Sequence, residues 1–237
     1  MTTKKAALLL LPNVLGEVAH HELFLPASVD RAVESLDGLI AESEKGGRRF
    51  LARFNIDKKA QDVPLALLNE HTKKDEIDFL LEPIRKGERW GLISDAGLPC
   101  IADPGYELVF RARNSGILVQ AFSGPSSILL SLMLSGLPGQ HFTFHGYAPM
   151  EPALPLRRLE KRSQEEKSTQ IFIEAPYRSQ KFLETLLETL DPDTLLACAW
   201  DLTLPTQGIL SQPVALWKKS PLPNLTKKPA VFLFHRK

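Results

Sequence analysis

The sequence contains very little cysteine. Of its 237 residues only Cys100 and Cys198 are cysteines, and they lie far apart without C-x-x-C or histidine-ligand spacing. Disulfide-stabilised folds and zinc sites need several cysteines or histidines at short, regular spacings. We therefore expect two reduced thiols, no disulfide framework and no metal site.

A long apolar run is also absent. A membrane-spanning helix needs about 20 consecutive apolar residues, and no segment approaches that length. Lys4 and Lys5, followed by the apolar residues 6–11, resemble a short signal peptide, but Pro12 interrupts the run and no cleavage site follows. We expect residues 6–11 to form a buried strand, and the protein to be cytoplasmic without a membrane partner.

The sequence has no large excess of charge of either sign. It carries 29 basic and 28 acidic side chains, a net charge of +1, and its isoelectric point is about 7.8. A strongly basic nucleic-acid-binding domain would have an isoelectric point above about 9. One local basic group, Lys45, Arg48, Arg49 and Arg53, can hold a phosphate, although such groups more often form a solvated face.

Apolar segments of strand length alternate with longer amphipathic segments, and this alternation predicts parallel strands joined by helices. The spacing of Val29, Val33, Leu36 and Ile40 predicts one long helix, which ends before Gly46-Gly47. The predicted helices cover residues 26–44, 74–85, 106–114, 126–135, 157–166 and 179–190, and the predicted strands cover residues 6–11, 64–68, 90–93, 117–122, 142–147, 170–174, 195–199 and 230–234. The fold class is therefore α/β, and Gly124 indicates a boundary between two domains, residues 1–123 and 124–237.

The densest turn sequence follows the strand at residues 90–93. Ser94 and Asp95 would lie at its carboxyl end, where ligands bind in open α/β sheets. Gly97 removes a side chain where a ligand could approach the backbone, and Asp103 stands at the start of the next helix. Taken alone, this pattern supports a ligand loop and an ordinary strand-to-helix turn about equally.

The same segment carries a family resemblance. Residues 94–105, SDAGLPCIADPG, followed by a helix, a strand and Ser123-Gly124-Pro125-Ser126-Ser127, resemble the tetrapyrrole methylase family. The most similar branch is that of the bacterial small-subunit rRNA cytidine 2′-O-methyltransferases. Residues 39–42, 68–71, 135–138, 142–149 and 171–178 also resemble segments of that branch in the same order. Residues 39–42 would correspond to the end of the first helix.

Three segments depart from the family pattern. The first loop, residues 11–17, matches the family's P-T-P-I-G-N-L only in part. A-E-D-T-R is represented by Ala41-Glu42-Ser43-Glu44-Lys45, and R-E-L-T-K is replaced in residues 199–204. The part of the pattern associated with the cofactor is thus intact, whereas the part expected to face the substrate is altered.

The resemblance implies two α/β domains with mostly parallel sheets, an inter-domain cleft that binds S-adenosylmethionine, and a homodimer. It places cofactor contacts at Leu11, Pro12, Asp95, Ala96, Gly97, Leu98, Ser126, Ser127, Ile128, Ile173, Pro229 and Ala230. Ser127 is equally suited to cap the following helix. Glu42 and Glu174 are the candidate general bases, and for Glu42 alone a surface salt bridge is the simpler interpretation.

The implied activity is methyl transfer from S-adenosylmethionine, with RNA as a possible substrate. Two alternatives remain open. One is methylation of a tetrapyrrole or another small molecule, and the other is a catalytically degenerate paralogue that keeps the cofactor site.

Overall fold

The computed structural model describes residues 5–237, so Lys4 of the leader-like start lies outside the described residues. The chain divides into two compact units, Met1–Ser126 and Ser127–Lys237, called here the N-terminal and C-terminal units. The domain boundary expected from the sequence, between residues 123 and 124, lies just before this division.

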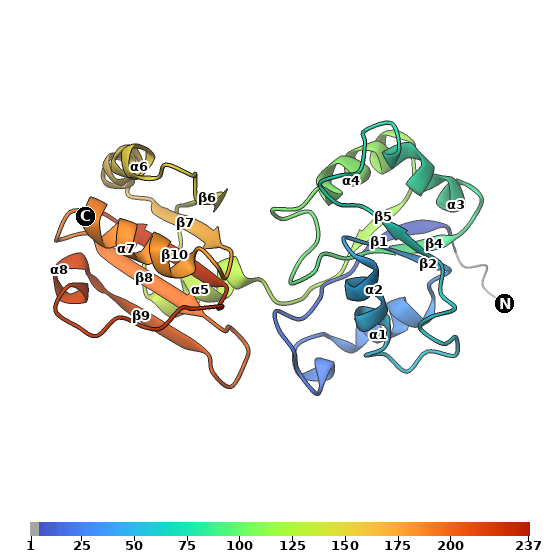
Figure 1. Cartoon of the computed structure of the whole chain (residues 1–237). Helices are drawn as coiled ribbons and strands as arrows, with labels where there is room; N and C mark the ends of the chain where they lie inside the picture. Colours follow the sequence, from blue (N-terminus) through green and yellow to red (C-terminus); the bar gives the residue numbers. More distant parts are fainter. Residues whose placement is uncertain (1–4) are drawn as a thin grey trace. The chain divides into compact units, whose positions relative to one another are not determined.

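The N-terminal unit is a parallel sheet with helices on both faces (Figure 1). Its sheet has the strand order β3-β2-β4-β1-β5, and every pair in it is parallel. Its elements are β1 (Ala7–Leu10), η1 (His21–Leu23), α1 (Ala27–Glu34), β2 (Gly38–Ala41), α2 (Glu44–Leu51), β3 (Leu65–Leu67), η2 (Ile77–Leu81), α3 (Glu82–Arg85), β4 (Arg89–Leu92), α4 (Gly105–Asn114) and β5 (Val119–Ala121).

Alternating residues of the central strands build a core on each face. Leu9 packs in one cluster with α1 and α2, and its neighbour Leu8 packs in another with η2, α3 and α4. Side chains along a strand alternate between faces, so a strand covered on both sides is apolar at nearly every position. This explains the unbroken apolar sequence of β1.

The prediction of one helix over residues 26–44 is wrong. The helix α1 ends at Glu34, and Gly38–Ala41 form β2. Four apolar residues also fit a helical period, so periodicity alone could not separate the two structures. Residues 39–41 accordingly form the end of a strand, and not of a helix, and Glu42 follows that strand.

Gly46 and Gly47 lie inside α2 and do not end a helix, again contrary to the prediction. A Cβ atom on Gly47 would lie 2.3 Å from Leu65 Cδ1, and one on Gly46 would lie 2.6 Å from Asp95 Oδ1. Neighbouring side chains thus occupy the space that a Cβ atom would take at either glycine. Ser43 begins the helix by accepting a hydrogen bond from the Gly46 N–H.

The C-terminal unit is built on a mixed sheet with the strand order β6-β7-β10-β8-β9. Its elements are α5 (Ser127–Ser135), β6 (Phe142–Tyr147), α6 (Ala153–Glu166), β7 (Thr169–Glu174), α7 (Ser179–Thr189), β8 (Leu195–Trp200), β9 (Gly208–Pro213), α8 (Val214–Trp217) and β10 (Ala230–His235). Side chains of α6, α7 and α8 share one core with this sheet, and α5 packs on β8, β9 and β10.

The α/β class is confirmed, and five of the eight strand pairs in residues 5–237 are parallel. Within the C-terminal unit, however, only β6 and β7 pair in parallel, so the expectation of a mostly parallel sheet does not hold there. The last strand, β10, runs antiparallel between β7 and β8, and the short segment 201–207 joins β8 and β9 as a hairpin. Strand β9 was not predicted, because Gly208, Ser211 and Pro213 weaken its strand pattern.

None of the helices within residues 5–237 has the length and hydropathy needed to cross a membrane.

Candidate functional site

In the N-terminal unit, two predicted cofactor loops are held together at the carboxyl ends of adjacent strands. Asn13, in the loop after β1, exchanges two backbone hydrogen bonds with Gly97, at 2.8 and 3.2 Å. Its side-chain Nδ2 donates to the carbonyl oxygens of Ser94 and Asp95, each at 3.0 Å. Asn13 therefore joins the loop of Leu11 and Pro12 to the loop of Asp95–Leu98.

Gly97 has a conformation that favours glycine. Its φ angle is +72°, and an added Cβ atom would lie 3.2 Å from Leu15 Cδ2 and 3.4 Å from the Pro125 carbonyl oxygen. A Cβ atom on Gly124 would lie only 2.1 Å from Pro12 Cβ. The loop after β1, the loop after β4 and the segment that leads to Ser126 thus lie against one another.

Glu42 joins the same group from β2. It follows the carboxyl end of that strand, and its Oε1 accepts a hydrogen bond from the Asp95 backbone N–H at 2.8 Å. Asn69 Nδ2 donates to the Glu42 carbonyl at 3.1 Å. Burial raises the pKa of the Glu42 carboxyl, as do the nearby charges of Asp95 and Asp103, against the opposing effect of the hydrogen bond from Asp95. Glu42 is therefore a half-buried carboxylate with increased proton affinity, in direct contact with the Asp95 loop.

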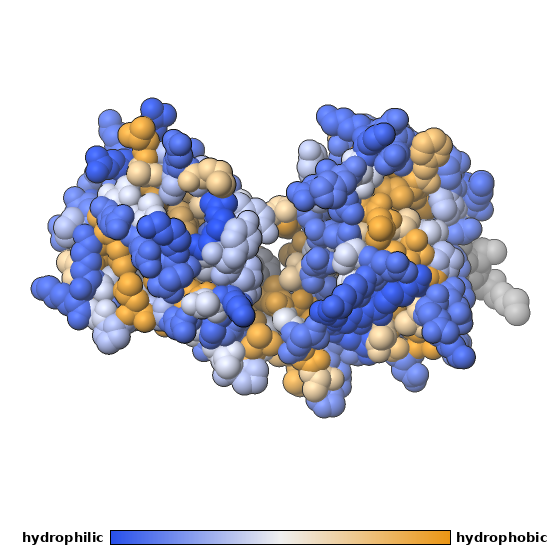
Figure 2. Space-filling view, in the orientation of Figure 1, coloured by the Kyte–Doolittle hydropathy of each residue, from blue (hydrophilic) through white to orange (hydrophobic). Residues whose placement is uncertain are grey.

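A pocket of about 420 Å³ opens beside Asp95. It is lined by Asn13, Val14, Leu15, Gly16, Glu17, Ser43, Lys45, Gly46, Arg49, Arg53 and Asp95. In Figure 2 the surface over α2 is strongly hydrophilic. Three members of the basic group noted in the sequence line this pocket. The fourth, Arg48, does not, because its Nη1 donates to the carbonyls of Ala60 and Val63 at 2.8 and 2.7 Å.

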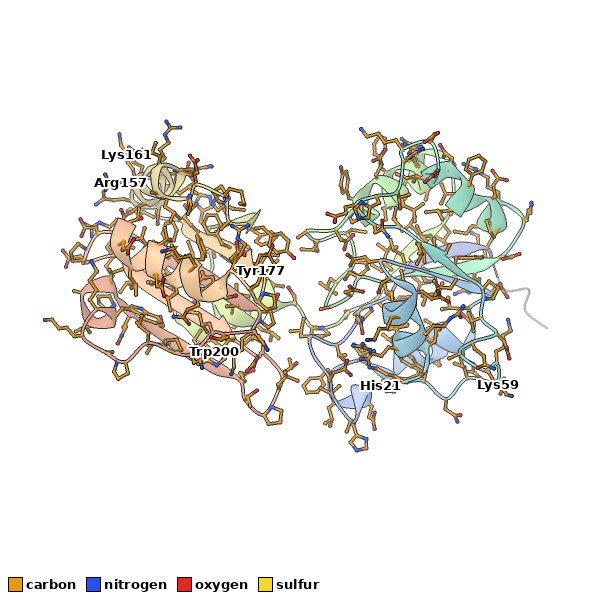
Figure 3. All side chains as sticks on the ribbon, in the orientation of Figure 1. His21, Lys59, Arg157, Lys161, Tyr177 and Trp200 are labelled. Carbon is orange, nitrogen blue, oxygen red and sulfur yellow. The ribbon has the colours of Figure 1, made fainter. Side chains whose placement is uncertain are left out.

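In the C-terminal unit, the predicted residues lie at one end of the sheet. Ile173 and Glu174 end β7, where Glu174 stands opposite Ala230, the first residue of β10 after Pro229. Trp200, labelled in Figure 3, stands opposite Ala230 on its other side. The sheet thus places Ile173, Glu174, Pro229 and Ala230 together.

The Glu174 side chain is fully buried. Its Oε2 accepts from the Ala175 N–H at 2.8 Å, and Arg178 Nη2 lies 2.9 Å from Oε1. The same Arg178 nitrogen donates to the carbonyls of Ala148 and Pro149, and Oε1 receives no hydrogen bond from residues 5–237. A buried carboxylate oxygen without a donor can accept one from a ligand.

Ser127 and Ile128 begin α5, which packs against β10, the strand of Ala230. Ile128 is buried, and Ser127 is partly exposed. The roles of Ser126, Ser127 and Ile128 toward a ligand stay predictions.

The two cysteines are free thiols. Burial raises the pKa of the Cys100 thiol to about 12, and the charge of Asp103 adds to this effect. Burial also raises the pKa of Cys198. Among residues 5–237, no three His, Cys, Asp or Glu side chains are grouped as metal ligands.

The family model described as Tetrapyrrole (Corrin/Porphyrin) Methylases matches residues 22–216. The chain belongs to this family. The family predicted from the SDAGLP segment is therefore confirmed.

Several relatives carry the name ribosomal RNA small subunit methyltransferase I. The Vibrio cholerae protein is 30% identical over 85% of this chain, and the Thermotoga maritima protein is 31% identical over 83%. The Xylella fastidiosa protein is 34% identical over 75% of the chain. The match spans 87% of the Thermotoga protein, but 65% and 63% of the Vibrio and Xylella proteins, which is less than two thirds of their length.

Solved structures support the fold. The methyltransferase CobJ aligns with a TM-score of 0.65 at 18% identity, over 98% of this chain and 94% of its own. Cobalt precorrin-4 methyltransferase CbiF aligns with a TM-score of 0.65 at 12% identity, over 97% of this chain and 95% of its own.

The sequence did not identify seven residues that line the pocket beside Asp95. They are residues 13–17 of the first loop, and Ser43 and Gly46 at the start of α2. The first loop and the A-E-D-T-R segment had been noted only as departures from the family pattern. The signal available in the sequence was the place of these two segments along the chain. Each lies at the end of a strand that flanks β4, and β4 carries the Asp95 loop.

Proposed function

We propose that the protein is an S-adenosylmethionine-dependent methyltransferase that acts on RNA. The observation that carries this proposal is the joined loop pair of Asn13 and Gly97, with the carboxylate of Glu42 bound to the Asp95 N–H. Membership of the methylase family supports the reaction class. The names of the relatives support a ribosomal RNA substrate.

The cofactor would supply an electrophilic methyl group. In the N-terminal unit, Leu11, Pro12 and residues Asp95–Leu98 would bind it largely through backbone groups, and Gly97 leaves room for that approach. In the C-terminal unit, Ser127, Ile128, Ile173, Pro229 and Ala230 would contribute. Glu174 Oε1, which is ion-paired with Arg178 but receives no hydrogen bond from the described residues, fits this role, because the cofactor carries N–H and O–H donors.

Glu42 is the candidate general base, and Glu174 is better suited to hold the cofactor. Glu42 has a raised pKa, and it precedes Ser43 and binds the Asp95 N–H, two residues that line the pocket. A raised pKa suits a group that takes a proton from a hydroxyl. Glu174 is fully buried and bound to Arg178 and Ala175. Orientation of the acceptor can supply about 7–11 kcal/mol of the rate enhancement, and the base a further ~10²–10⁴-fold.

The test is calorimetric titration with S-adenosylmethionine and S-adenosylhomocysteine, after any co-purified ligand has been removed. We expect micromolar binding to the wild type and none to Gly97→Val, because the new side chain meets Leu15 and Pro125 at a positive φ angle. Thermal unfolding must show that the variant remains folded. Binding that is equal in the two proteins would remove this loop from the site.

Two further functions remain as candidates, and each is distinguishable. The basic lining of the pocket also suits the carboxylates of a tetrapyrrole, so absorbance changes with a tetrapyrrole precursor would favour that substrate. Tight cofactor binding without turnover on any RNA would favour a degenerate paralogue.

We also propose that the protein is a cytoplasmic homodimer, as the family resemblance implies. Light scattering on the purified protein tests the assembly, and a monomeric mass at micromolar concentration would contradict it.

A further inference from the structure

Helix α2 and the turn after it direct three cations into the pocket beside Asp95. Lys45, Arg49 and Arg53 are spaced four residues apart, so they follow one helical face. The pocket also contains two carboxylates, those of Glu17 and Asp95. Its lining therefore has an excess of positive charge within a chain that is almost neutral overall.

The positive charge of the Arg53 guanidinium is only weakly balanced by its neighbours. Its side chain is only 13% exposed, and its nearest polar contacts are long, 3.5 Å to Asn13 Oδ1 and 3.6 Å to Glu17 Oε2. Burial lowers the pKa of this guanidinium, as does the charge of Arg49, although Glu17 acts in the opposite direction. Arg48, five residues earlier, shows the contrasting case of an arginine whose donors bind carbonyls at normal distances.

Glu17 occupies the space between the arginines. It lies in the loop after β1, its side chain is 70% exposed, and its carboxylate forms ion pairs with Arg49 and Arg53. An exposed loop carboxylate loses little when it moves into water, because solvent replaces its contacts. Glu17 is thus an internal anion that a ligand anion can replace.

We propose that this pocket binds a phosphodiester of the acceptor strand, whose oxygens displace the Glu17 carboxylate from Arg49 and Arg53. The inference rests on the proposed function and assigns a position to its substrate. Ser43 lines the pocket and directly follows Glu42, so a bound phosphate would lie close to the candidate base. In RNA, a phosphate and the 2′-hydroxyl belong to the same nucleotide, which fits this arrangement. Arginine forks bind phosphate oxygens in pairs.

The experiment measures binding of a fluorescein-labelled single-stranded RNA 20-mer by anisotropy, at several salt concentrations. Arg53→Gln should weaken binding about tenfold, as loss of a charge-assisted contact does, and should make the salt slope shallower by about 0.7. Glu17→Gln should tighten binding several-fold.

Two control variants change the net charge by the same amount as the test variants, at residues that do not line the pocket. Lys59→Gln removes a positive charge from the loop between α2 and β3; Lys59, labelled in Figure 3, is not one of the residues that line the pocket. Glu34→Gln removes a negative charge from the exposed end of α1. Both should bind RNA within about twofold of the wild type, as expected for surface charges remote from the ligand.

Equal affinities of Arg53→Gln and Lys59→Gln, together with equal affinities of Glu17→Gln and Glu34→Gln, would overturn the proposal. If uroporphyrin binds with the same dependence on Arg53 and Glu17 while RNA does not, the anion is a carboxylate and the phosphodiester is refuted. Should Arg53→Gln fail to fold, Glu17→Gln still decides, because Glu17 is exposed.

Cofactor titration of the same variants separates this proposal from the proposed function. If the wild type binds the cofactor and methylates RNA, but Arg53→Gln and Glu17→Gln leave the RNA affinity unchanged, only the phosphate pocket is refuted. If the wild type does not bind the cofactor, the methyltransferase activity is refuted. The RNA affinities of the variants would still test the phosphate pocket.

Discussion

At the residue scale, two glutamates occupy similar places and differ in their surroundings. Glu42 follows β2 and Glu174 ends β7, each at the carboxyl end of a strand. Glu174 is enclosed and ion-paired with Arg178, whereas Glu42 is half-buried beside the acidic side chains of Asp95 and Asp103. Their environments therefore make Glu42 the better candidate of the two for a group that exchanges a proton.

We predict that Glu42→Gln lowers kcat by about 10²–10⁴-fold with little change in cofactor affinity. Because a base must be ionised, wild-type turnover should fall as the pH drops through the raised pKa of Glu42. Glu174→Gln should instead raise the KM for the cofactor with a smaller effect on kcat. Initial rates of methyl transfer to RNA across pH test both statements. The assignment is wrong if the two variants show the opposite pattern.

The same carboxyl affects stability. A raised pKa means that the fold favours the protonated form, so this contribution to stability is present below the unfolded pKa and lost as the pH rises through the folded pKa. Glutamine is neutral at every pH. The melting temperature of Glu42→Gln should therefore fall less than that of the wild type as the pH rises over this window.

At the element scale, α2 depends on two glycines for different reasons. A Cβ atom on Gly47 would meet Leu65 Cδ1 and the Ala41 side chain, so this glycine allows α2 to pack closely on β2 and β3. A Cβ atom on Gly46 would meet Asp95 Oδ1 and Ser43 Oγ, so that glycine leaves room for side chains of the pocket. Two adjacent residues of one helix thus have different roles, Gly47 in core packing and Gly46 in the pocket.

We predict that Gly47→Ala lowers the free energy of unfolding by about 1–3 kcal/mol, because overpacking outweighs the gain of up to about 1 kcal/mol in helix propensity. Urea unfolding measures this change. In the Leu65→Ala background the clash with Leu65 is removed, so the same substitution should cost much less. An equal cost in both backgrounds would contradict this packing.

At the scale of the whole molecule, the chain has separate cores. Two clusters of apolar residues lie within the N-terminal unit, and another lies within the C-terminal unit. Leu8 belongs to the first unit and Phe172 to the second, and both are buried. Each unit therefore has the apolar packing needed for a cooperative transition of its own.

We predict that Leu8→Ala costs about 2–5 kcal/mol and Phe172→Ala about 3–5 kcal/mol, each within its own unit. Hydrogen exchange followed by mass spectrometry should show faster exchange only in peptides of the unit that carries the substitution. A uniform increase along the chain would instead indicate a single cooperative unit.

Local patterns of sequence predicted much of this molecule. The alternation of apolar and amphipathic segments predicted the α/β class, and residues 94–105 identified the family, because both depend on neighbours along the chain. Most predicted strands lie within two residues of those in the structure. Residues 38–41 are the clearest exception, since four apolar residues fit a helix and a strand equally well.

The tertiary structure alone decided which residues meet. By itself, the sequence could group Lys45, Arg48, Arg49 and Arg53, but only the packing of α2 turns Arg48 toward the carbonyls of Ala60 and Val63 and the other three toward the pocket. The contact of Glu42 with the Asp95 N–H likewise depends on the pairing of β2 with β4, whose paired residues lie 52 positions apart in the sequence, as Gly38 and Trp90 do. Local preference specified the elements, whereas long-range packing and strand order placed their side chains together.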